Sequence, residues 1–582
     1  MVRLLFLVPF LAVYLLTSCK KDKPSNDPIT YGSSFALNLF AEKAVYKPGE
    51  TVRFSINRNL QGDWKVRLRH LNSLILEQPV SGNSVSIALP AQDFKGYLVE
   101  LVEIKEGKEI IQASIGVDVS SDWHRFPRYG FLSKFGAIRE MEMEKTMEQL
   151  TRHHINGLQF YDWQYKHHQP LAGTGALPMQ SWTDIANKEV RLNTLKKYIE
   201  LAHEKGMKTM FYNLAFGALE DAAADGVKEE WYLFKDANRK EKDKHVLPQP
   251  FFKSDIFLTD AGNGEWQNYL INQNKQVYQA LDFDGYHVDA LGDRGKLYNY
   301  NGEPVNQAED FSSFLAAIKN AAPAKKMVMN AVNQYGQRES IALAPVDFLY
   351  TEVWHPNETY ADIATILGNN YFLSDGKPTV LAAYMNYTLS DNPGYFNTPG
   401  LLLTDAVIFS LGGAHLELGE HILSKEYFPH TNLQVKDELR VALMKYYDFM
   451  VAYENLLRDG GEWNELAVVC TNQKMTINQW PPVSGNVSLL SKKVDNRQVL
   501  HLHNFNQATD LNWRDTNGQQ RKPELVENAI LRCMVNQKVT KVWVASPDHF
   551  QGAPQEISFV QEGNELVFTL PSLLYWNMIV IE

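Results

Sequence analysis

Residues 283–292 read FDGYHVDALG and contain a short apolar strand pattern that ends at Asp289. They follow an amphipathic stretch over Glu265–Leu281, whose length and spacing are typical of a helix. A buried strand next to such a helix predicts a unit in which neighbouring strands run parallel. Period-two alternation places His287 and Asp289 on one face of the strand.

The same rhythm extends in both directions from this strand. Further amphipathic stretches cover Glu142–His153 and Leu192–Lys205, and Gly206 follows the second as a C-cap residue. The expected strands are Tyr129–Leu132, Gly157–Tyr161, Lys208–Asn213, Gly285–Leu291, Met327–Ala331, Phe348–Val353, Val380–Met385 and Ala406–Leu411. Eight such units predict a (β/α)8 barrel over residues 122–455. A doubly wound open sheet is the alternative, although no strand is followed by G-x-G-x-x-G.

Short alternating strands occur on both sides of this region. Residues 33–121 predict an immunoglobulin-like antiparallel β-sandwich, and residues 456–582 predict a second antiparallel β-sandwich. Neither segment shows a cluster of catalytic side chains. We therefore expect a multidomain chain in which the chemistry belongs to the central region.

The first residues predict export. Residues 1–18 contain Arg3 and an apolar run that is too short to span a membrane, and Cys19 follows Leu-Thr-Ser as in a bacterial lipobox. We expect a cleaved signal peptide, lipid on Cys19, and a polar tether over residues 19–32. The protein is then an exported outer-membrane lipoprotein that faces either the periplasm or the surface. An ordinary secretory signal is the alternative.

Composition excludes several classes of function. The chain has 582 residues, 45% of them hydrophobic, and a formal net charge of -11, which disfavours nucleic acid as a partner. Three cysteines exclude a disulfide scaffold, although Cys470 and Cys533 are either paired or buried thiols. No zinc, nucleotide or EF-hand motif occurs, so we expect no cofactor and no catalytic metal; a structural calcium ion stays open.

Two acidic residues end apolar strands in the central region. Asp289 ends the fourth expected strand, and Glu352 ends the sixth, where Tyr350 and Trp354 share its face. A pair of carboxyl groups across a cleft is what glycoside hydrolysis requires, with one group acting as a base or nucleophile and the other as an acid. The alternative for each acid alone is a salt-bridged or metal-bound strand end.

Three segments together resemble glycoside hydrolase family 66. They are residues 159–168 (QFYDWQYKHH), the strand ending at Asp289, and residues 350–354 (YTEVW). The family contains endo-dextranases and cycloisomaltooligosaccharide glucanotransferases. The resemblance implies a retaining enzyme acting on α-1,6-glucan, with Asp289 as nucleophile and Glu352 as acid/base. Cyclising members carry an inserted carbohydrate-binding module, and no insertion of that size is present here.

Other side chains near the expected strand ends are candidates for substrate binding. Asparagine amides can read two hydroxyls, and an aromatic face can stack on a pyranose. For Asp162 the alternative is a loop cap, and for Trp163 and His287 it is a place in the core. The candidates are Asp162, Tyr161, Trp163, Asn213, His287, Asn330, Trp354 and Asn357.

The sequence therefore predicts a retaining endo-hydrolase of dextran, with dextran and isomaltooligosaccharides as partners. One alternative is a cyclising or transglycosylating glucanotransferase on the same polymer. An alternative of another class is a surface lipoprotein that binds glycans without cleaving them.

Overall fold

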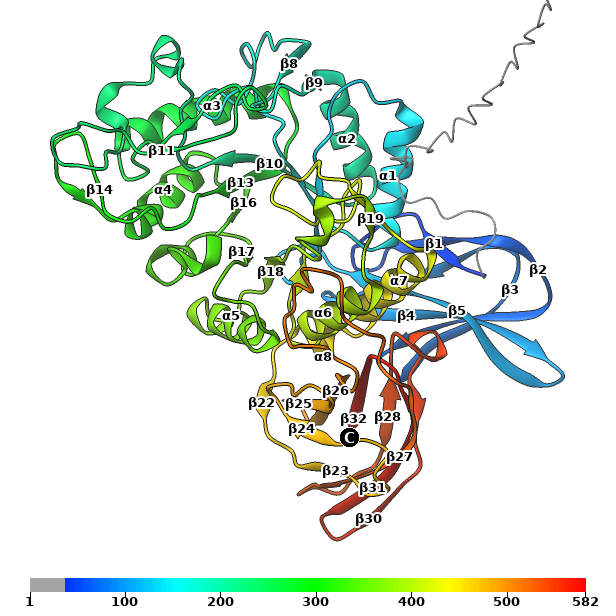
Figure 1. Cartoon of the computed structure of the whole chain (residues 1–582). Helices are drawn as coiled ribbons and strands as arrows, with labels where there is room; N and C mark the ends of the chain where they lie inside the picture. The colour runs from blue at the N-terminus through cyan, green and yellow to red at the C-terminus, as the bar shows by residue number, and fades with distance from the viewer. Residues whose placement is uncertain (1–36) are drawn as a thin grey trace, which may run out of the picture.

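The computed structural model describes residues 37–582 (Figure 1). The predicted signal peptide, Cys19 and the tether lie outside the described residues. Within residues 37–582, none of the helices combines the length and apolar character needed to cross a membrane. The chain is multidomain and mixes helices with sheets, as expected.

Eight short parallel strands form the centre of the molecule. They are β6 (Tyr129–Leu132), β7 (Gly157–Phe160), β10 (Lys208–Leu214), β13 (Gly285–Asp289), β16 (Lys326–Met329), β17 (Leu349–Glu352), β18 (Thr379–Ala382) and β20 (Ala414–His415). Strands β6 to β16 pair in chain order, and so do β17 to β20. A parallel bridge between Asn330 and Tyr350 joins the two groups. The Phe131 amide donates to the Leu418 carbonyl at 3.1 Å, which closes the ring.

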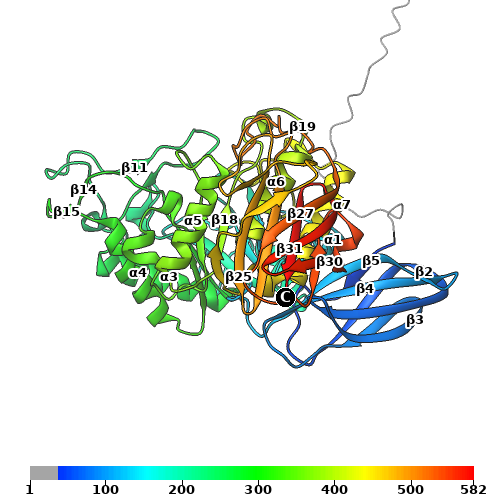
Figure 2. The same cartoon turned by 90° about the horizontal axis from the view of Figure 1, so that it is seen from below.

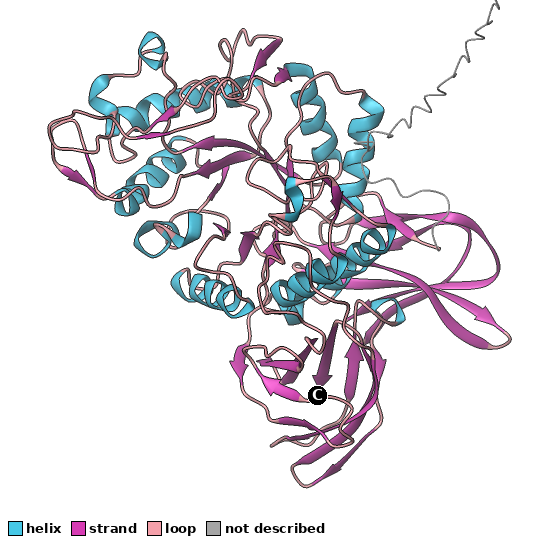
Figure 3. Cartoon of the chain, viewed as in Figure 1, coloured by secondary structure: helices cyan, strands magenta, loops and turns pink. Residues whose placement is uncertain are grey.

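Helices follow most of these strands and cover them from outside (Figures 1 and 3). They are α1 (Glu140–Arg152), α2 (Leu192–Glu204), α3 (Gly264–Ala280), α4 (Gln307–Ala321), α5 (Tyr360–Leu373), α6 (Thr398–Ser410), α7 (Asp437–Ala452) and α8 (Glu454–Leu457). Helix α2 ends next to Gly206, which has a φ of 77° and can adopt the left-handed conformation without a Cβ penalty.

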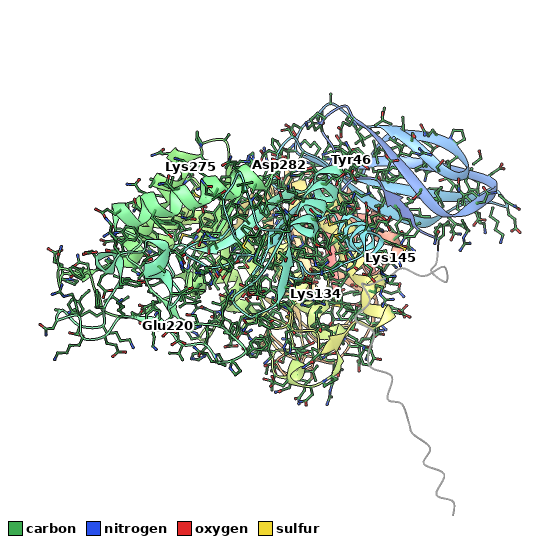
Figure 4. All side chains as sticks on the ribbon, turned by 90° about the horizontal axis from the view of Figure 1, so that it is seen from above. Tyr46, Lys134, Lys145, Glu220, Lys275 and Asp282 are labelled. Atoms are coloured by element: carbon green, nitrogen blue, oxygen red, sulfur yellow. The ribbon has the colours of Figure 1, made fainter. Side chains whose placement is uncertain are left out.

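The parallel register brings the carboxyl ends of the strands to one edge of the ring. Leu214 pairs with Asp289, and Glu352 pairs with Ala382. In Figure 4, Lys134 and Glu220, which follow β6 and β10, lie on the opposite side of the view from Asp282, which precedes β13. Loops after the strands therefore share one face of the ring.

The expected eighth strand at Ala406–Leu411 is wrong. Residues 406–410 belong to α6, Leu411 is its C-cap, and the eighth strand is β20, which follows after a short turn. Every residue of α6 except Pro399 is buried, so the helix is buried on all sides and its apolar residues show no helical periodicity. A short apolar run of this kind does not distinguish a strand from a buried helix.

The N-terminal region also differs from the expectation of an immunoglobulin-like sandwich of short strands. Its strands β1 (Leu39–Ala41), β2 (Thr51–His70), β3 (Ser73–Ala88), β4 (Lys95–Lys105) and β5 (Lys108–Val119) form one antiparallel sheet. Strand β2 has 20 residues and shifts register after Ser55 and again after Leu60. Such irregularities bend a long strand, so a single sheet encloses the core that two separate sheets were expected to share.

The C-terminal region contains two sheets that share one apolar core. One sheet comprises β22 (Glu462–Asn464), β24 (Ile477–Gln479), β25 (Val487–Val494), β26 (Arg497–Asn504), β28 (Val542–Ala545), β29 (Gln555–Glu556) and β32 (Trp576–Ile581). The other comprises β23 (Val468–Cys470), β27 (Val526–Met534), β30 (Phe559–Glu562) and β31 (Glu565–Leu573). Cys470 and Cys533 lie on neighbouring strands of the second sheet, and both are free thiols.

Short strand pairs occur in the loops of the ring. They are β8 (Ser181–Thr183) with β9 (Glu189–Arg191), β11 (Lys244–His245) with β12 (Ile256–Phe257), β14 (Leu297–Tyr298) with β15 (Pro304–Val305), and β19 (Gly394–Tyr395) with β21 (Leu433–Gln434). They stiffen loops that follow the strands of the ring.

The N-terminal sheet projects from the ring at one side (Figure 2) and packs on α7 through β4 and β5. At this junction Gly116 lies against α7 so closely that a Cβ atom would be 2.6 Å from the Asp448 carbonyl oxygen. The Asp448 carboxylate accepts hydrogen bonds from the Gly116 amide, Arg152 and His154. A buried ionic network therefore fixes the sheet to the ring.

Candidate active site

A cavity of about 280 Å³ lies at the carboxyl ends of the ring strands. Its wall includes the last residues of β13 and β17, Asp289 and Glu352, together with side chains from the loops after β7, β10, β16 and β18. His287 on β13 and Tyr350 and Trp354 at β17 also line it, as their alternation along the strands predicts. The cavity is therefore the candidate active site.

Asp289 is held by three hydrogen bonds. The Tyr212 hydroxyl donates to Oδ2 at 2.8 Å, and Oδ1 accepts from Asn330 Nδ2 and from the Ala290 amide, both at 2.8 Å. Burial raises the pKa of the Asp289 carboxyl, while these three donors lower it because they favour the ionised form. No cation pairs with this carboxylate among the ion pairs of residues 37–582.

Glu352 lies in a similar environment, where the side chains of Tyr384, Trp354 and Asn330 act as donors. Its Oε1 accepts a short hydrogen bond from the Tyr384 hydroxyl, and its Oε2 lies 3.4 Å from Asn330 Nδ2. Burial and the negative charge of Asp289 raise the pKa of Glu352 to about 7. A carboxyl with that pKa carries its proton over a useful part of the neutral range, as a general acid must.

Asn330 connects the two carboxyl groups. Its single Nδ2 group reaches Asp289 Oδ1 at 2.8 Å and Glu352 Oε2 at 3.4 Å, so those two oxygens lie no more than 6.2 Å apart, the sum of the two distances. Its Oδ1 accepts from the Glu352 amide at 3.2 Å. The sequence predicts that Asn330 reads sugar hydroxyls; in the structure its amide is already bonded to the acidic pair.

Asp162 lies in the cavity wall and in a strained backbone conformation. It is buried, and its φ of 48° is in the left-handed region, which costs energy for a residue other than glycine. From the residues that the structure describes, its carboxylate accepts one hydrogen bond, a long one of 3.5 Å from Gln164. Burial and the charges of Asp184 and Asp289 raise its pKa to about 7, against the effect of Lys188. The carboxyl is therefore available to a ligand.

Aromatic side chains form much of the remaining wall. Tyr161 stacks on Phe428 with ring centres 3.9 Å apart, and its hydroxyl donates to the Glu426 carbonyl at 2.9 Å. Trp354 packs on Tyr384 at 5.4 Å and stays partly exposed. His287 is buried beneath the acids against Tyr129, and burial lowers its pKa to about 3, which keeps the ring neutral.

Three predicted binding residues do not reach the cavity. Trp163 is fully buried in the core, where its Nε1 donates to the Tyr212 carbonyl at 3.1 Å. Asn213 points away from the cavity and bonds to His167, because Tyr212 rather than Asn213 has the strand parity that faces the cavity. Asn357 donates to Asn333 Oδ1 at 2.7 Å and stabilises its own loop.

Sequence reasoning missed the two tyrosines that bond to the acids. Tyr212 and Tyr384 each stand near the end of an expected strand, on the face that points into the ring. The signal that reveals them is alternation counted along those strands in the same way as for Asp289. Both hydroxyls are buried, and the pKa of each is well above its usual value of 10.0, so both donate as neutral phenols.

Two groups of residues have the side-chain types of metal ligands. In the group His168, Asp221 and Asp225, the Lys166 ammonium lies 2.6 Å from both aspartates and occupies the place that a metal ion would take. The other group, Asp405, His415 and Glu417, is fully buried. Neither group lines the cavity, and we assign neither to the chemistry there.

Comparison with known proteins decides the family. The model of glycosyl hydrolase family 66 matches residues 41–580. The chain belongs to glycosyl hydrolase family 66. The match extends from the end of β1 to within β32 and so covers nearly all of the described residues.

The individual relatives of this family 66 chain have low sequence identity to it. A cycloisomaltooligosaccharide glucanotransferase of Niallia circulans is 26% identical, over 98% of this chain and 75% of its own length. A dextranase of Streptococcus salivarius is 24% identical, over 84% of this chain and 67% of its own length. A Paenibacillus sp. cycloisomaltooligosaccharide glucanotransferase, complexed with cycloisomaltoheptaose, superposes with a TM-score of 0.85 at 23% identity, over 93% of this chain and 99% of that one. It shares the fold of this chain.

Proposed function

We propose that the protein is a retaining endo-hydrolase of α-1,6-glucosidic linkages in dextran. The proposal rests on the pair of carboxyl groups, Asp289 and Glu352, that Asn330 bridges. Asp289 Oδ1 and Glu352 Oε2, the two oxygens that face the Asn330 amide, lie within 6.2 Å of each other. Retaining glycosidases place their two carboxyl groups about 5–5.5 Å apart, whereas inverting enzymes need about 6.5–9.5 Å to admit a water molecule between the base and the sugar ring.

In the first step, Asp289 attacks the anomeric carbon while Glu352 gives its proton to the leaving glycosidic oxygen. Oδ2 of Asp289 is the better nucleophile of the two oxygens, because it accepts one hydrogen bond and Oδ1 accepts two. The C–O bond to the leaving sugar breaks, and a glycosyl ester forms on Asp289. Tyr212 and Asn330 hold the carboxylate in place throughout.

In the second step, Glu352 is ionised and acts as a base. It takes a proton from water, whose oxygen attacks the anomeric carbon and displaces Asp289. The Tyr384 hydroxyl, bonded to Glu352 Oε1, stabilises the ionised form that this step needs. Two inversions return the product to the α configuration of the substrate.

Hydrolysis is favoured over cyclisation by the length of the chain. The alignment with the Niallia circulans glucanotransferase extends over 734 positions, although this chain has 582 residues. That relative therefore contains inserted segments that this chain lacks. Cyclising or transglycosylating activity on α-1,6-glucan is the alternative, since a sugar hydroxyl can replace water in the second step.

Digestion of dextran followed by separation of the products tests this proposal. The proposal expects linear isomaltooligosaccharides with a rapid fall in polymer length, as endo-cleavage produces. Cyclic products as the main fraction would favour the glucanotransferase alternative. Binding of dextran without release of reducing sugar would favour a glycan-binding lipoprotein.

We also propose that the closed ring is a (β/α)8 barrel of the kind that carries its active site at the strand carboxyl ends, with the C-terminal sheets as a β-sandwich.

The sequence before the described residues supports export as a lipoprotein anchored through Cys19. Labelling with a radioactive fatty acid tests this anchor. Wild type should take up label, and Cys19→Ala should not; equal labelling would contradict the proposal.

A further inference from the structure

A loop of the C-terminal region reaches the active site. Residues 505–525 leave the sheets between β26 and β27 and lie against the loops that follow β17 and β18. Trp513 Nε1 donates to the Asn357 carbonyl at 2.8 Å, and its own carbonyl accepts from Thr404 at 2.7 Å. The Asn386 amide donates to the Arg514 carbonyl at 2.9 Å. These bonds fix the loop at the catalytic face.

The Arg514 side chain joins two strand ends with one planar group. It is 6% exposed; Nη1 donates to the Tyr384 carbonyl at 3.1 Å and Nη2 donates to the Val353 carbonyl at 2.9 Å. Val353 directly follows Glu352, and Tyr384 is the residue whose hydroxyl bonds to Glu352. One guanidinium thus holds the backbone of the acid and the backbone of its hydrogen-bond donor.

Among the described residues, the charge of Arg514 has one long ion-pair partner. Its nearest carboxylate is Glu358, whose Oε2 lies 3.9 Å from Nε. The guanidinium carbon lies 5.3 Å from the ring centre of Trp354 and 4.5 Å from that of Trp513. Burial of a cation costs several kcal/mol unless charges or dipoles compensate it. A neutral donor could join the two loops at a lower free-energy cost. The positive charge of Arg514 therefore suggests a functional role.

Few groups around Glu352 carry charge. Tyr350 on the same strand, Tyr161 and Tyr384 all have pKa values raised well above 10.0 and stay neutral. Asp289 is the charged group that acts most strongly on Glu352, and Glu352 in turn acts on the charge of Arg514, after Glu358, Tyr384 and Tyr387. Asp289 favours the protonated acid before cleavage, and Arg514 favours the carboxylate after the proton has left.

We propose that Arg514 is a positioning residue for the acid/base: its two-pronged donation fixes Glu352 against Tyr384 and Trp354, and its charge stabilises ionised Glu352. The C-terminal region then completes the active site, although it contributes no group that touches the reacting atoms. This inference rests on the proposed role of Glu352 and adds a residue from another domain to it.

Three variants separate the charge, the two-pronged contact and simple anchoring. Arg514→Met removes both charge and contact, Arg514→Lys keeps the charge, and Trp513→Phe loses an anchoring hydrogen bond of the same loop. Steady-state rates on dextran are measured between pH 4 and pH 9, with thermal unfolding to confirm folding.

We expect Arg514→Met to lower kcat by roughly 10- to 100-fold with KM changed less than about twofold, since misplacement of a catalytic group acts mainly on the chemical step. Its basic limb should move to higher pH, because loss of a nearby positive charge raises the pKa of Glu352. Arg514→Lys should lower kcat by a smaller factor and leave the limb in place. Trp513→Phe should lower the unfolding temperature and leave both kinetic quantities nearly unchanged.

Wild-type kcat and an unmoved basic limb in folded Arg514→Met would overturn the inference. If Arg514→Met does not fold, Arg514→Lys decides: wild-type kcat with this variant would show that the two-pronged contact is dispensable and would overturn the positioning role. A wild-type enzyme that does not cleave dextran would instead refute the proposed function, which is a separate result.

Discussion

Carboxyl groups with little contact to solvent occur in two regions of this molecule and behave in opposite ways. At the junction with the N-terminal sheet, Asp448 accepts from Arg152 and His154, and these partners lower its pKa to about 2 despite burial. In the cavity, Asp289 and Glu352 are partly exposed, their donors are neutral, and the pKa of each is raised.

The difference teaches that burial alone does not set the role of an acid. A carboxylate with adjacent cations stays ionised and ties domains together. A carboxyl surrounded by phenols and an amide can gain or lose a proton near neutral pH, which catalysis by proton transfer requires. Substitutions in the two regions should therefore affect different properties.

The largest effect is expected for Asp289→Ala. Loss of the nucleophile should reduce kcat/KM by at least about 10⁴-fold with little change in unfolding temperature, because the aspartate supports chemistry and not the fold. Rates on dextran and thermal unfolding measure both. Asp293→Ala, an exposed neighbour, is the control. More than a tenth of wild-type activity in Asp289→Ala would remove its assignment.

Glu352→Gln should reduce activity by roughly 10²- to 10⁴-fold, because general acid–base catalysis contributes a factor of that order. In wild type, activity should fall as pH rises through about 7, where Glu352 loses the proton that the first step needs. The pH–rate profile of wild type and the rate of the variant check both statements, with exposed Glu339→Gln as control. A profile that is flat from pH 6 to pH 9 would contradict the role of Glu352.

Asp448→Asn should act on stability and not on chemistry. Breaking a buried ion pair costs about 3–5 kcal/mol. Since the folded pKa of Asp448 lies below its unfolded value, its contribution is present above about pH 4 and is lost as pH falls toward 2. Urea unfolding at pH 7 should show the loss, with kcat on dextran unchanged at 25 °C. A large loss of kcat in a folded variant would mean that the two regions are not distinct.

Tyr384→Phe should give the smallest change. Without the hydroxyl, ionised Glu352 loses a hydrogen bond, so its pKa rises above about 7 and the basic limb moves to higher pH. We expect roughly a tenfold loss of kcat, because Glu352, the base of the second step, is held less firmly in place. The pH–rate profile of the variant measures both. A limb that moves to lower pH would reverse our account of this hydrogen bond.

The sequence predicts most of the central fold because apolar strands alternate there with amphipathic helices. The expectation fails at Ala406–Leu411, where a helix is buried on all sides, and in the N-terminal region, where long bent strands have the local pattern of short ones. Local patterns carry no information on which face of a fully buried element meets which neighbour.

The acids of the site were accessible to sequence reasoning because strand ends in a parallel ring point to one face. Choosing Tyr212 over Asn213 requires the strand alternation to be counted without an error of one position, since one residue of shift reverses the direction of a side chain. Trp163 has the type of side chain that stacks on sugars, but it is buried in the core. Arg514 lies in another domain, and only the folded chain brings it to Glu352.

The anomeric form of the first product tests the central claim most directly. Proton NMR during the first minutes of dextran cleavage, before mutarotation, resolves the two anomers of the new reducing end. Double displacement through Asp289 predicts the α anomer first, with the β anomer appearing only as mutarotation proceeds. Initial release of the β anomer would show single displacement by water and would contradict the assignment of Asp289 as nucleophile.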